Sequence, residues 1–299
     1  MTARPIFLLG IQRGGTNQAL NILRSHPDTY WPQGEFHEVF RPRRGLRGEA
    51  PAVVLRKLAR YAPIWIGAGD ILDPDRRARS PGLLSGRRGR AVAAALRGAA
   101  AANRPAVTGY KAALRAHGLL DAVPEPSRLL CKVMNYNLLF AEDLRALYPE
   151  AVFVGLIRDA AGVCEGHVAR GASVAAAADA WVFVAGQLIA LQAAGLPLRI
   201  WRFEDLLADA GGVAREIYGA CGLDPAAVRG VCLQDKERIT DAAGAVRGVR
   251  KTEHFYSFDA MSRHMRADAN AAAQARLPAA ARAEIAARCA PQLRHFGYA

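Results

Sequence analysis

Residues 5–24 constrain the fold more than any other part of this 299-residue sequence. The apolar run at residues 6–9 is short and is followed by turn formers, which is typical of a parallel-sheet strand covered on both faces. Glycines at positions 10, 14 and 15 allow a tight turn, and apolar residues then recur at helical spacing from Thr16. The first N–H groups of a helix have no partner within it, so Gly14, Gly15, Thr16 and Asn17 are predicted to form an anion site.

The residues beside the glycines bear on which anion binds. A nucleotide-binding P-loop would place a lysine directly before Thr16, where this chain has Gly15, and this disfavours ATP or GTP. Arg13 precedes the glycine pair and supplies a positive charge. A plain strand-to-helix turn with a surface arginine is the alternative, because one glycine-rich loop is a weak signal.

Strands and helices alternate along much of the remaining sequence. This order predicts an α/β fold with three layers, in which a mostly parallel central sheet is flanked by helices. Strands are predicted at 106–111, 128–133, 151–157 and 198–203, and helices at 91–103, 138–148, 160–170 and 173–194. Beyond residue 205 the chain is predicted to be helical, apart from a loop rich in glycine and arginine at 244–254.

The position of the charged residues adds a site to this fold. Ligands of open parallel sheets bind at the carboxyl ends of the strands. Lys111, Lys132, Arg158 and Glu204 all lie near such ends in the predicted order. We therefore expect them to gather beside the glycine loop.

The whole chain, 1–299, is interpreted as a single domain with one insertion. Arginine clusters at 41–45 and 87–90 flank helix-like pieces and a middle rich in proline and glycine. This composition predicts a helical insertion or lid at 41–104, outside the core sheet.

Composition narrows the possible partners. The formal net charge of +13 is compatible with nucleic acid, a membrane surface or an anionic small molecule. Aromatic residues make up only 7% of the sequence and form no strip with basic residues, so a nucleic-acid role is disfavoured.

No run approaches the ~18 apolar residues of a membrane span, and the N-terminus lacks a signal-peptide layout. We expect a cytoplasmic protein without a membrane span. Its five scattered cysteines suggest neither disulfides nor a metal site.

Further motifs accompany the Arg-Gly-Gly-Thr loop in order. Arg158-Asp159 ends a predicted strand, and the segment 246–255 reads Val-Arg-Gly-Val-Arg-Lys-Thr-Glu-His-Phe. Arg202-Phe-Glu-Asp-Leu also precedes an amphipathic segment. Together these motifs resemble the PAPS-dependent sulfotransferases of bacterial and carbohydrate type, where PAPS is 3′-phosphoadenosine 5′-phosphosulfate. The likeness covers most of the chain outside 41–104 and implies a sulfotransferase fold like that of P-loop NTPases.

The resemblance implies a set of donor-binding residues. Residues 13–17 would hold the 5′-phosphosulfate, and Arg158 the 3′-phosphate. Gly14 and Gly166 stand where the family has serines. The late basic segment would fold over the adenosine 3′,5′-bisphosphate through Arg247, Gly248, Arg250 and Lys251, with Arg250 replacing a tryptophan.

The resemblance also implies a metal-free transfer that needs a base. Lys132 would stabilise the transferring group and Arg13 the leaving oxygen, but Met134 stands where some relatives have a histidine base, and it cannot accept a proton. Gly34-Glu-Phe-His-x-x-Phe resembles a segment in which the glutamate is the base, so Glu35 is the expected base and His37 its substitute. Capping of the following helix is the alternative role for Glu35.

The acceptor is the least defined part of the implied reaction. Lys111, in a Gly-Tyr-Lys segment that resembles Gly-Glu-Lys of glycan sulfotransferases, and Trp65 in the insertion are expected to line its site. The implied acceptor is a hydroxyl or amine of a carbohydrate, lipid or small molecule. A P-loop-like kinase or NTPase, and a basic nucleic-acid-binding protein, are the alternative functions.

Overall fold

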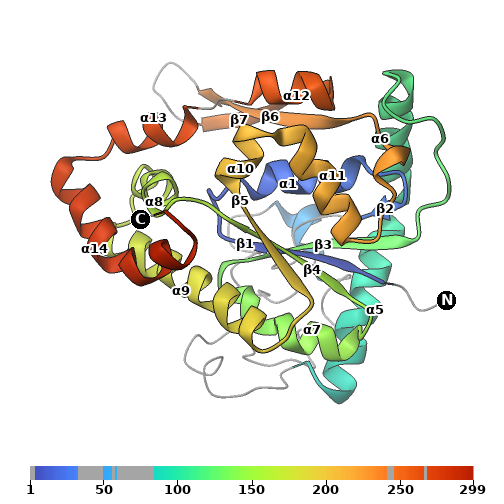
Figure 1. Ribbon diagram of the computed structural model, residues 1–299. Helices are drawn as coiled ribbons and strands as arrows, with labels where there is room; N and C mark the ends of the chain where they lie inside the picture. Colours follow the sequence, from blue (N-terminus) through green and yellow to red (C-terminus); the bar gives the residue numbers. More distant parts are fainter. Residues whose placement is uncertain are drawn as a thin grey trace.

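The computed structural model describes residues 4–32, 50–55, 58, 84–240, 246–265 and 268–298; the side chains of 88 and 235–251 are not described. Its centre is a five-stranded parallel sheet in the order β2-β3-β1-β4-β5 (Figure 1). The strands are β1 (Ile6–Gly10), β2 (Thr29–Tyr30), β3 (Arg128–Met134), β4 (Val152–Ile157) and β5 (Leu198–Arg202). The predicted α/β class is confirmed, as are three of the four later strands.

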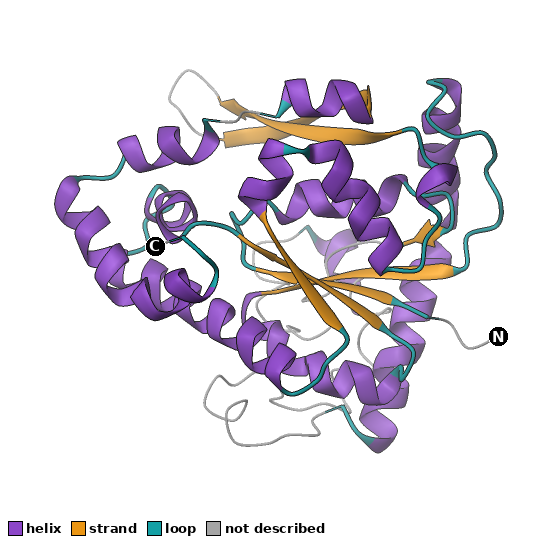
Figure 2. Cartoon of the chain, viewed as in Figure 1, coloured by secondary structure: helices purple, strands orange, loops and turns teal. Residues whose placement is uncertain are grey.

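Helices cover both faces of the sheet (Figure 2). One layer contains α1 (Thr16–Ser25), α10 (Phe203–Ala208) and α11 (Ala210–Ala220), and the other contains α7 (Ala141–Leu147), α9 (Val174–Ala193) and α14 (Ala279–His295). Short helix α8 (Ala160–Val168) and α13 (Ala269–Ala275) lie together beyond the carboxyl edge of the sheet (Figure 1).

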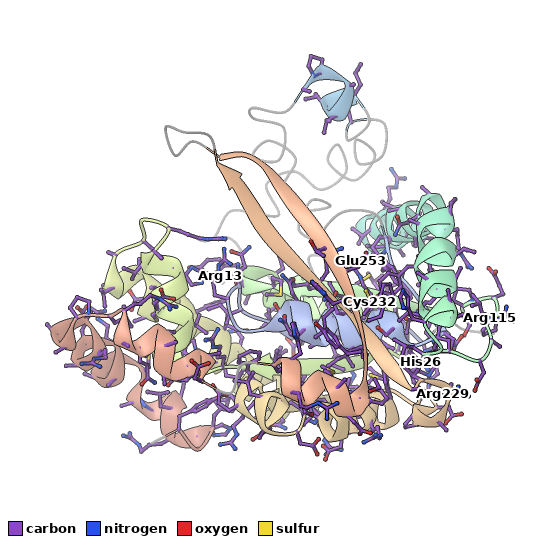
Figure 3. All side chains as sticks on the ribbon, turned by 90° about the horizontal axis from the view of Figure 1, so that it is seen from above. Arg13, His26, Arg115, Arg229, Cys232 and Glu253 are labelled. Atoms are coloured by element: carbon purple, nitrogen blue, oxygen red, sulfur yellow. The ribbon has the colours of Figure 1, made fainter. Side chains whose placement is uncertain are left out.

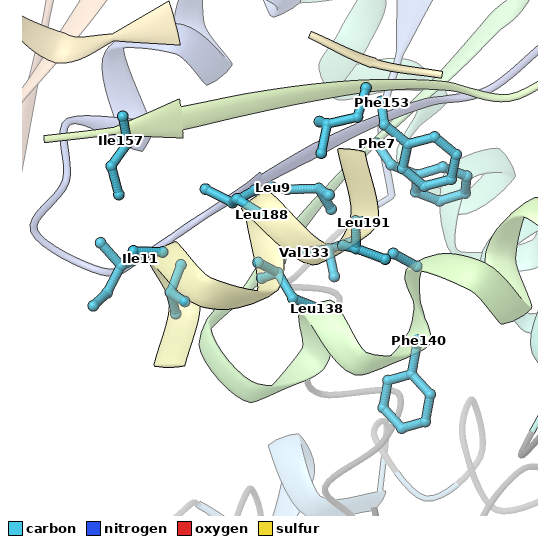
Figure 4. Packing of buried hydrophobic residues seen from close by; sticks show 14 of the residues in the cluster. Phe7, Leu9, Ile11, Val133, Leu138, Phe140, Phe153, Ile157, Leu188 and Leu191 are labelled. Atoms are coloured by element: carbon cyan, nitrogen blue, oxygen red, sulfur yellow. The ribbon is translucent and has the colours of Figure 1, made fainter. Parts of the chain in front are cut away.

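Strand β1 is central because its residues are apolar on both faces. Ile6 and Leu8 pack in the cluster that includes α1 and α11, whereas Phe7 and Leu9 pack in the cluster with α7 and α9. Phe7 stacks on Phe153 of β4 with 5.4 Å between ring centroids (Figure 4). All four β1 side chains are fully buried, and each contributes about 2 kcal/mol of transfer free energy.

Helix α9 differs from one expectation. Its 20 residues are long and apolar enough to cross a membrane by length and composition, although the sequence analysis found no such run. In the fold, Trp181, Leu188 and Leu191 are buried in the core cluster beside the sheet. We therefore interpret α9 as a core helix.

The strand predicted at 106–111 was wrong, because this segment belongs to α6 (Arg104–Ala116), which follows α5 (Gly86–Ala102). Val107, Lys111 and Leu114 are the buried residues of α6, and their spacing places them on one helix face. A short run with two apolar residues did not distinguish a strand from this face. The helix predicted at 91–103 is confirmed as part of α5.

Lys111 has a structural role in this fold. Its side chain is 1% exposed. Nζ donates to the carbonyl oxygen of Arg24, in the last turn of α1, and to that of His26, which follows the helix. Nζ also donates to Oγ1 of Thr29 over 3.2 Å. Burial lowers the pKa of Lys111 well below its usual value. Lys111 thus binds the C-terminal end of α1, and the expectation that it lines an acceptor site was wrong.

The chain beyond residue 229 contains an antiparallel hairpin where the sequence predicted helices and a loop. Strands β6 (Gly230–Thr240) and β7 (Val246–Ser257) pair along their length, and α12 (Phe258–His264) follows. Val231, Cys232 and Leu233 are buried in the cluster that contains α1, while the far part of the hairpin projects from the body (Figure 3). The hairpin depends on this distant contact, which local sequence patterns do not encode.

Candidate functional site

The loop between β1 and α1 has a tight left-handed backbone. Arg13 has φ of 70° and Gly15 has φ of 78°, and Gly15 is the N-cap of α1. A Cβ atom at Gly15 would lie 2.1 Å from the Phe203 ring, so this position requires glycine. No side chain caps the helix, and the N–H groups of its first turn therefore point toward a ligand site.

A cleft of about 890 Å³ lies in front of this helix end. Its lining comes from the β1–α1 loop, the end of β3, α8, α10 and the C-terminal segment. Five basic side chains and one acidic side chain line it: Arg13, Lys132, Arg158, Arg170, Arg276 and Glu165. The excess of positive charge and the helix N-terminus both favour an anionic ligand.

Lys132 lies at the loop end of the cleft. Its Nζ donates to Oδ1 of Asn17 over 2.7 Å, which fixes the ammonium beside the first turn of α1. Strand β3 ends at Met134, and the next residue, Asn135, has φ of 55° and accepts at Oδ1 from the backbone N–H of Gln12 over 3.0 Å. Lys132 and the loop are therefore held in register by adjacent strands.

Arg158, directly after β4, connects the loop to the C-terminal segment. Its Nη1 donates to the carbonyl of Arg13 over 3.1 Å, and its Nε donates to Oδ1 of Asn270 over 2.7 Å. The guanidinium carbon lies 4.9 Å from the centre of the Phe203 ring. Burial lowers the pKa of Arg158, while Glu204 and Asp159 oppose that shift. Each Nη nitrogen donates one N–H to a described carbonyl, which leaves its second N–H for the cleft.

The two glycines that replace family serines lie in crowded places. A Cβ at Gly166 of α8 would come within 2.9 Å of Cγ of Arg13, so the alkyl stem of Arg13 occupies the space of a side chain there. At Gly14, a Cβ would lie 3.0 Å from Cγ2 of Ile11. Neighbouring side chains thus occupy the space that a serine would need at either position.

The sequence analysis did not assign residues 269–276 and Tyr298, here called the C-terminal segment, to the site. Asn270 of α13 donates to Glu204, and Tyr298 donates to the other oxygen of Glu204 over 2.6 Å. Burial and the Glu204 carboxylate raise the pKa of Tyr298 far above its usual range. Gln274 donates to Asp159, which caps α8. No motif marks residues 269–276, because only tertiary packing brings them to the cleft.

Several predicted site residues cannot be placed in the cleft. Glu35, His37 and Trp65 lie outside the described residues. Residues 41–49, 56–57 and 59–83 of the 41–104 insertion also lie outside them. Arg247, Gly248, Arg250 and Lys251 lie on strand β7 rather than in a loop, and their side chains are not described. Among the described residues, no three His, Cys, Asp or Glu side chains cluster as metal ligands.

The chain can now be compared with known proteins. No curated protein matches the chain. Similar solved structures include the sulfotransferase domain of the Synechococcus PCC 7002 olefin synthase, at 18% identity, 75% of each chain and a TM-score of 0.41. A sulfotransferase from Alicyclobacillus acidocaldarius has 16% identity over 76% of this chain and 84% of its own, with a TM-score of 0.41. One from Mycobacterium tuberculosis has 18% identity over 75% of this chain and 68% of its own, with a TM-score of 0.42.

The match to a family model is the decisive comparison. It covers residues 5–227, which include the β1–α1 loop, Lys132 and Arg158. The matched region is more than half of the chain and contains all five strands of the parallel sheet. The chain therefore belongs to the sulfotransferase family.

Proposed function

We propose that this protein is a PAPS-dependent sulfotransferase that transfers a sulfuryl group to a hydroxyl or amine of a carbohydrate, lipid or small-molecule acceptor. The observation that carries the proposal is the convergence of three anion-binding features on one cleft. These are the uncapped N-terminus of α1, the Lys132 ammonium and the Arg158 guanidinium. We further propose that it acts in the cytoplasm, without a metal ion.

The chemistry of the cleft fits a donor with separate anionic groups. At the β1–α1 loop, Arg13, the N–H groups of Thr16 and Asn17, and Lys132 suit a phosphosulfate. Beside this loop, the planar fork of Arg158 suits a phosphate monoester. Gly15 keeps the backbone open to close approach, because no side chain fits at that position. PAPS would supply the sulfuryl group, and adenosine 3′,5′-bisphosphate would be the product.

The chain's own residues supply charge stabilisation and positioning. Lys132, held by Asn17, would place its ammonium where negative charge develops during transfer, and Arg13 would serve the leaving oxygen. The fixed loop geometry would keep these groups aligned for in-line displacement. Because they are held before the ligand arrives, little reorganisation is needed during the reaction.

The base and the acceptor site rest on the sequence resemblance. Glu35 would accept the proton of the acceptor hydroxyl, with His37 as its substitute. Trp65 and the 41–104 insertion would shape the acceptor site. Arg247, Gly248, Arg250 and Lys251 would contact the bound nucleotide from the hairpin.

Thermal-shift titration tests the donor proposal. Adenosine 3′,5′-bisphosphate in a metal-free buffer should raise the melting temperature in a saturable way, because it binds only the folded state. ATP with Mg²⁺ and a DNA oligonucleotide are the comparison ligands. Stabilisation by Mg²⁺-ATP alone would instead support a kinase or NTPase, and steeply salt-dependent stabilisation by the oligonucleotide would support nucleic-acid binding. Mass spectrometry of acceptor mixtures incubated with isotope-labelled PAPS would then identify the acceptor class.

A further inference from the structure

Arg276, directly after α13, lies outside the residues matched by the family model but lines the cleft. It comes from a different part of the chain than the β1–α1 loop, β3 and β4. Its Nε donates to Oε1 of Glu165 on α8 over 2.6 Å. Its two Nη nitrogens make no hydrogen bond with a described residue, so the outer edge of the guanidinium is available to a ligand.

The ion pair with Glu165 is unequally exposed. The Glu165 side chain is 15% exposed, whereas that of Arg276 is 59% exposed. The Arg276 hydrogen bond lowers the pKa of Glu165, so the carboxylate stays charged and holds its partner. Glu165 therefore acts as the inner support, and Arg276 as the outer group that meets the solvent-filled cleft.

Arg158 and Arg276 line the same cleft, on either side of residues of helix α8. Gly162 and Gly166 of α8 have no side chain, so Arg158 and Arg13 pack directly against this helix in the cleft wall. Arg170 lies at the end of the same surface. Asn270 connects α13 to Arg158, so the segment that carries Arg276 is tied to the cleft at a second point. Glu165 thus holds Arg276 through Nε, and Asn270 holds the helix that precedes Arg276; neither contact uses the Nη groups of Arg276.

We infer that Arg276 is a further ligand-binding residue, which contacts the phosphate bound by Arg158 and is positioned for this by Glu165. The inference rests on the proposed function, because it assigns Arg276 to the 3′-phosphate of the donor. Arg276 then helps the protein to distinguish a nucleotide 3′,5′-bisphosphate from a nucleotide that carries only a 5′-phosphate.

Calorimetric titration of the full chain tests this assignment. Arg276→Gln should weaken binding of adenosine 3′,5′-bisphosphate about tenfold, the usual size of a lost charge-assisted hydrogen bond. Binding of adenosine 5′-monophosphate should change less than about threefold, since that ligand lacks the 3′-phosphate. The control is Arg288→Gln on α14, which removes the same charge from an exposed arginine paired with Glu284 and Asp179. It should leave both affinities unchanged.

A double variant separates direct contact from simple charge compensation. Arg276→Gln alone leaves Glu165 unpaired in an anion-binding cleft, and that charge could itself repel the ligand. Combining Glu165→Gln with Arg276→Gln removes both charges, and affinity for the bisphosphate should stay low if Arg276 contacts the phosphate. Recovery of wild-type affinity, or equal affinities of the Arg276 and Arg288 variants, would overturn the inference alone. Failure of the wild-type protein to bind the bisphosphate would overturn both this inference and the proposed donor.

Discussion

Nη1 of Arg158 donates a hydrogen bond to the backbone carbonyl of Arg13 over 3.1 Å. This contact joins the end of β4 to the left-handed loop that precedes α1. Arg158 thereby supports the loop backbone as well as presenting charge to the cleft. The alkyl stem of Arg13 in turn packs against Gly166 of α8, the helix that follows Arg158.

Replacing Arg158 by lysine should weaken binding of adenosine 3′,5′-bisphosphate about tenfold or more, although the charge is kept. A lysine cannot span Arg13, Asn270 and a phosphate at once, because it has no planar fork. Calorimetry on the variant measures the loss. Arg145→Lys is the matched control, since Arg145 is exposed and donates to Gly195 away from the cleft. Unchanged affinity of Arg158→Lys would remove Arg158 from the donor site.

Gly166→Ser restores the family's residue but should weaken donor binding several-fold. The new Cβ would contact Cγ, Cδ and Cβ of Arg13 at 2.9–3.2 Å, so the arginine stem must move. Gly186→Ser on α9 is the control, because no atom outside its own helix lies within 4 Å of a Cβ there. Tighter binding by Gly166→Ser would show that Arg13 can move without loss and that the hydroxyl is simply missing.

Glu35→Gln should abolish sulfuryl transfer while leaving binding of adenosine 3′,5′-bisphosphate intact. The amide keeps the size of the side chain but cannot accept the acceptor's proton at neutral pH. Turnover would be followed by mass spectrometry and binding by calorimetry. Glu38→Gln, three residues later, controls for a general effect of removing a carboxylate from this segment. A fully active Glu35→Gln enzyme would exclude Glu35 as the base and direct attention to His37.

His26, after the C-terminal end of α1, should make folding stability depend on pH. Burial lowers its pKa to about 4, from about 6.5 in the unfolded chain, and the nearby Lys111 charge adds to this effect, whereas Asp28 and Asp224 oppose it. Nδ1 accepts from the Asp28 N–H over 3.2 Å, and Nε2 lies 3.0 Å from the Asp224 carbonyl, so the neutral ring is the form that fits.

The sign of the pH effect follows from proton uptake. Between pH 4 and 6.5 the unfolded chain binds a proton at His26 that the folded chain does not, so the free energy of unfolding falls as pH decreases. The contribution is about 3 kcal/mol across this window. Urea denaturation of His26→Gln should show a flatter pH dependence than the wild type. His295→Gln, at an exposed histidine, should retain the wild-type slope. A slope that is equal in all three proteins would contradict the prediction.

The two ends of α1 explain why Lys111 was misplaced by the sequence analysis. Arg13 lies before the N-terminus of α1 and His26 lies beyond its other end (Figure 3). Lys111 binds carbonyls at the His26 end, so it is remote from the anion site at the opposite helix end. A lysine is informative about a ligand site only when its exposure is known, and α6 buries this one completely.

The sequence by itself determined strands β1, β3, β4 and β5 of the parallel sheet and the loop after β1. Continuous apolar strands must be covered on both faces, and the glycines before Thr16 allow a turn that opens a helix N-terminus, so both features follow from local chemistry. Lys132 and Arg158 were found from the same rule, because each lies in or directly after a strand that this rule identifies.

Only the tertiary structure decided how that loop is supported and closed. The contact of the Arg13 stem with Gly166, of Arg158 with Asn270 and of Glu165 with Arg276 each joins segments more than 100 residues apart. The β6–β7 hairpin likewise forms against α1 rather than from its own preference. Such contacts depend on packing geometry, whereas strand and helix patterns depend on residues close in sequence. The sequence therefore did not predict that Asn270 and Arg276 belong to the site.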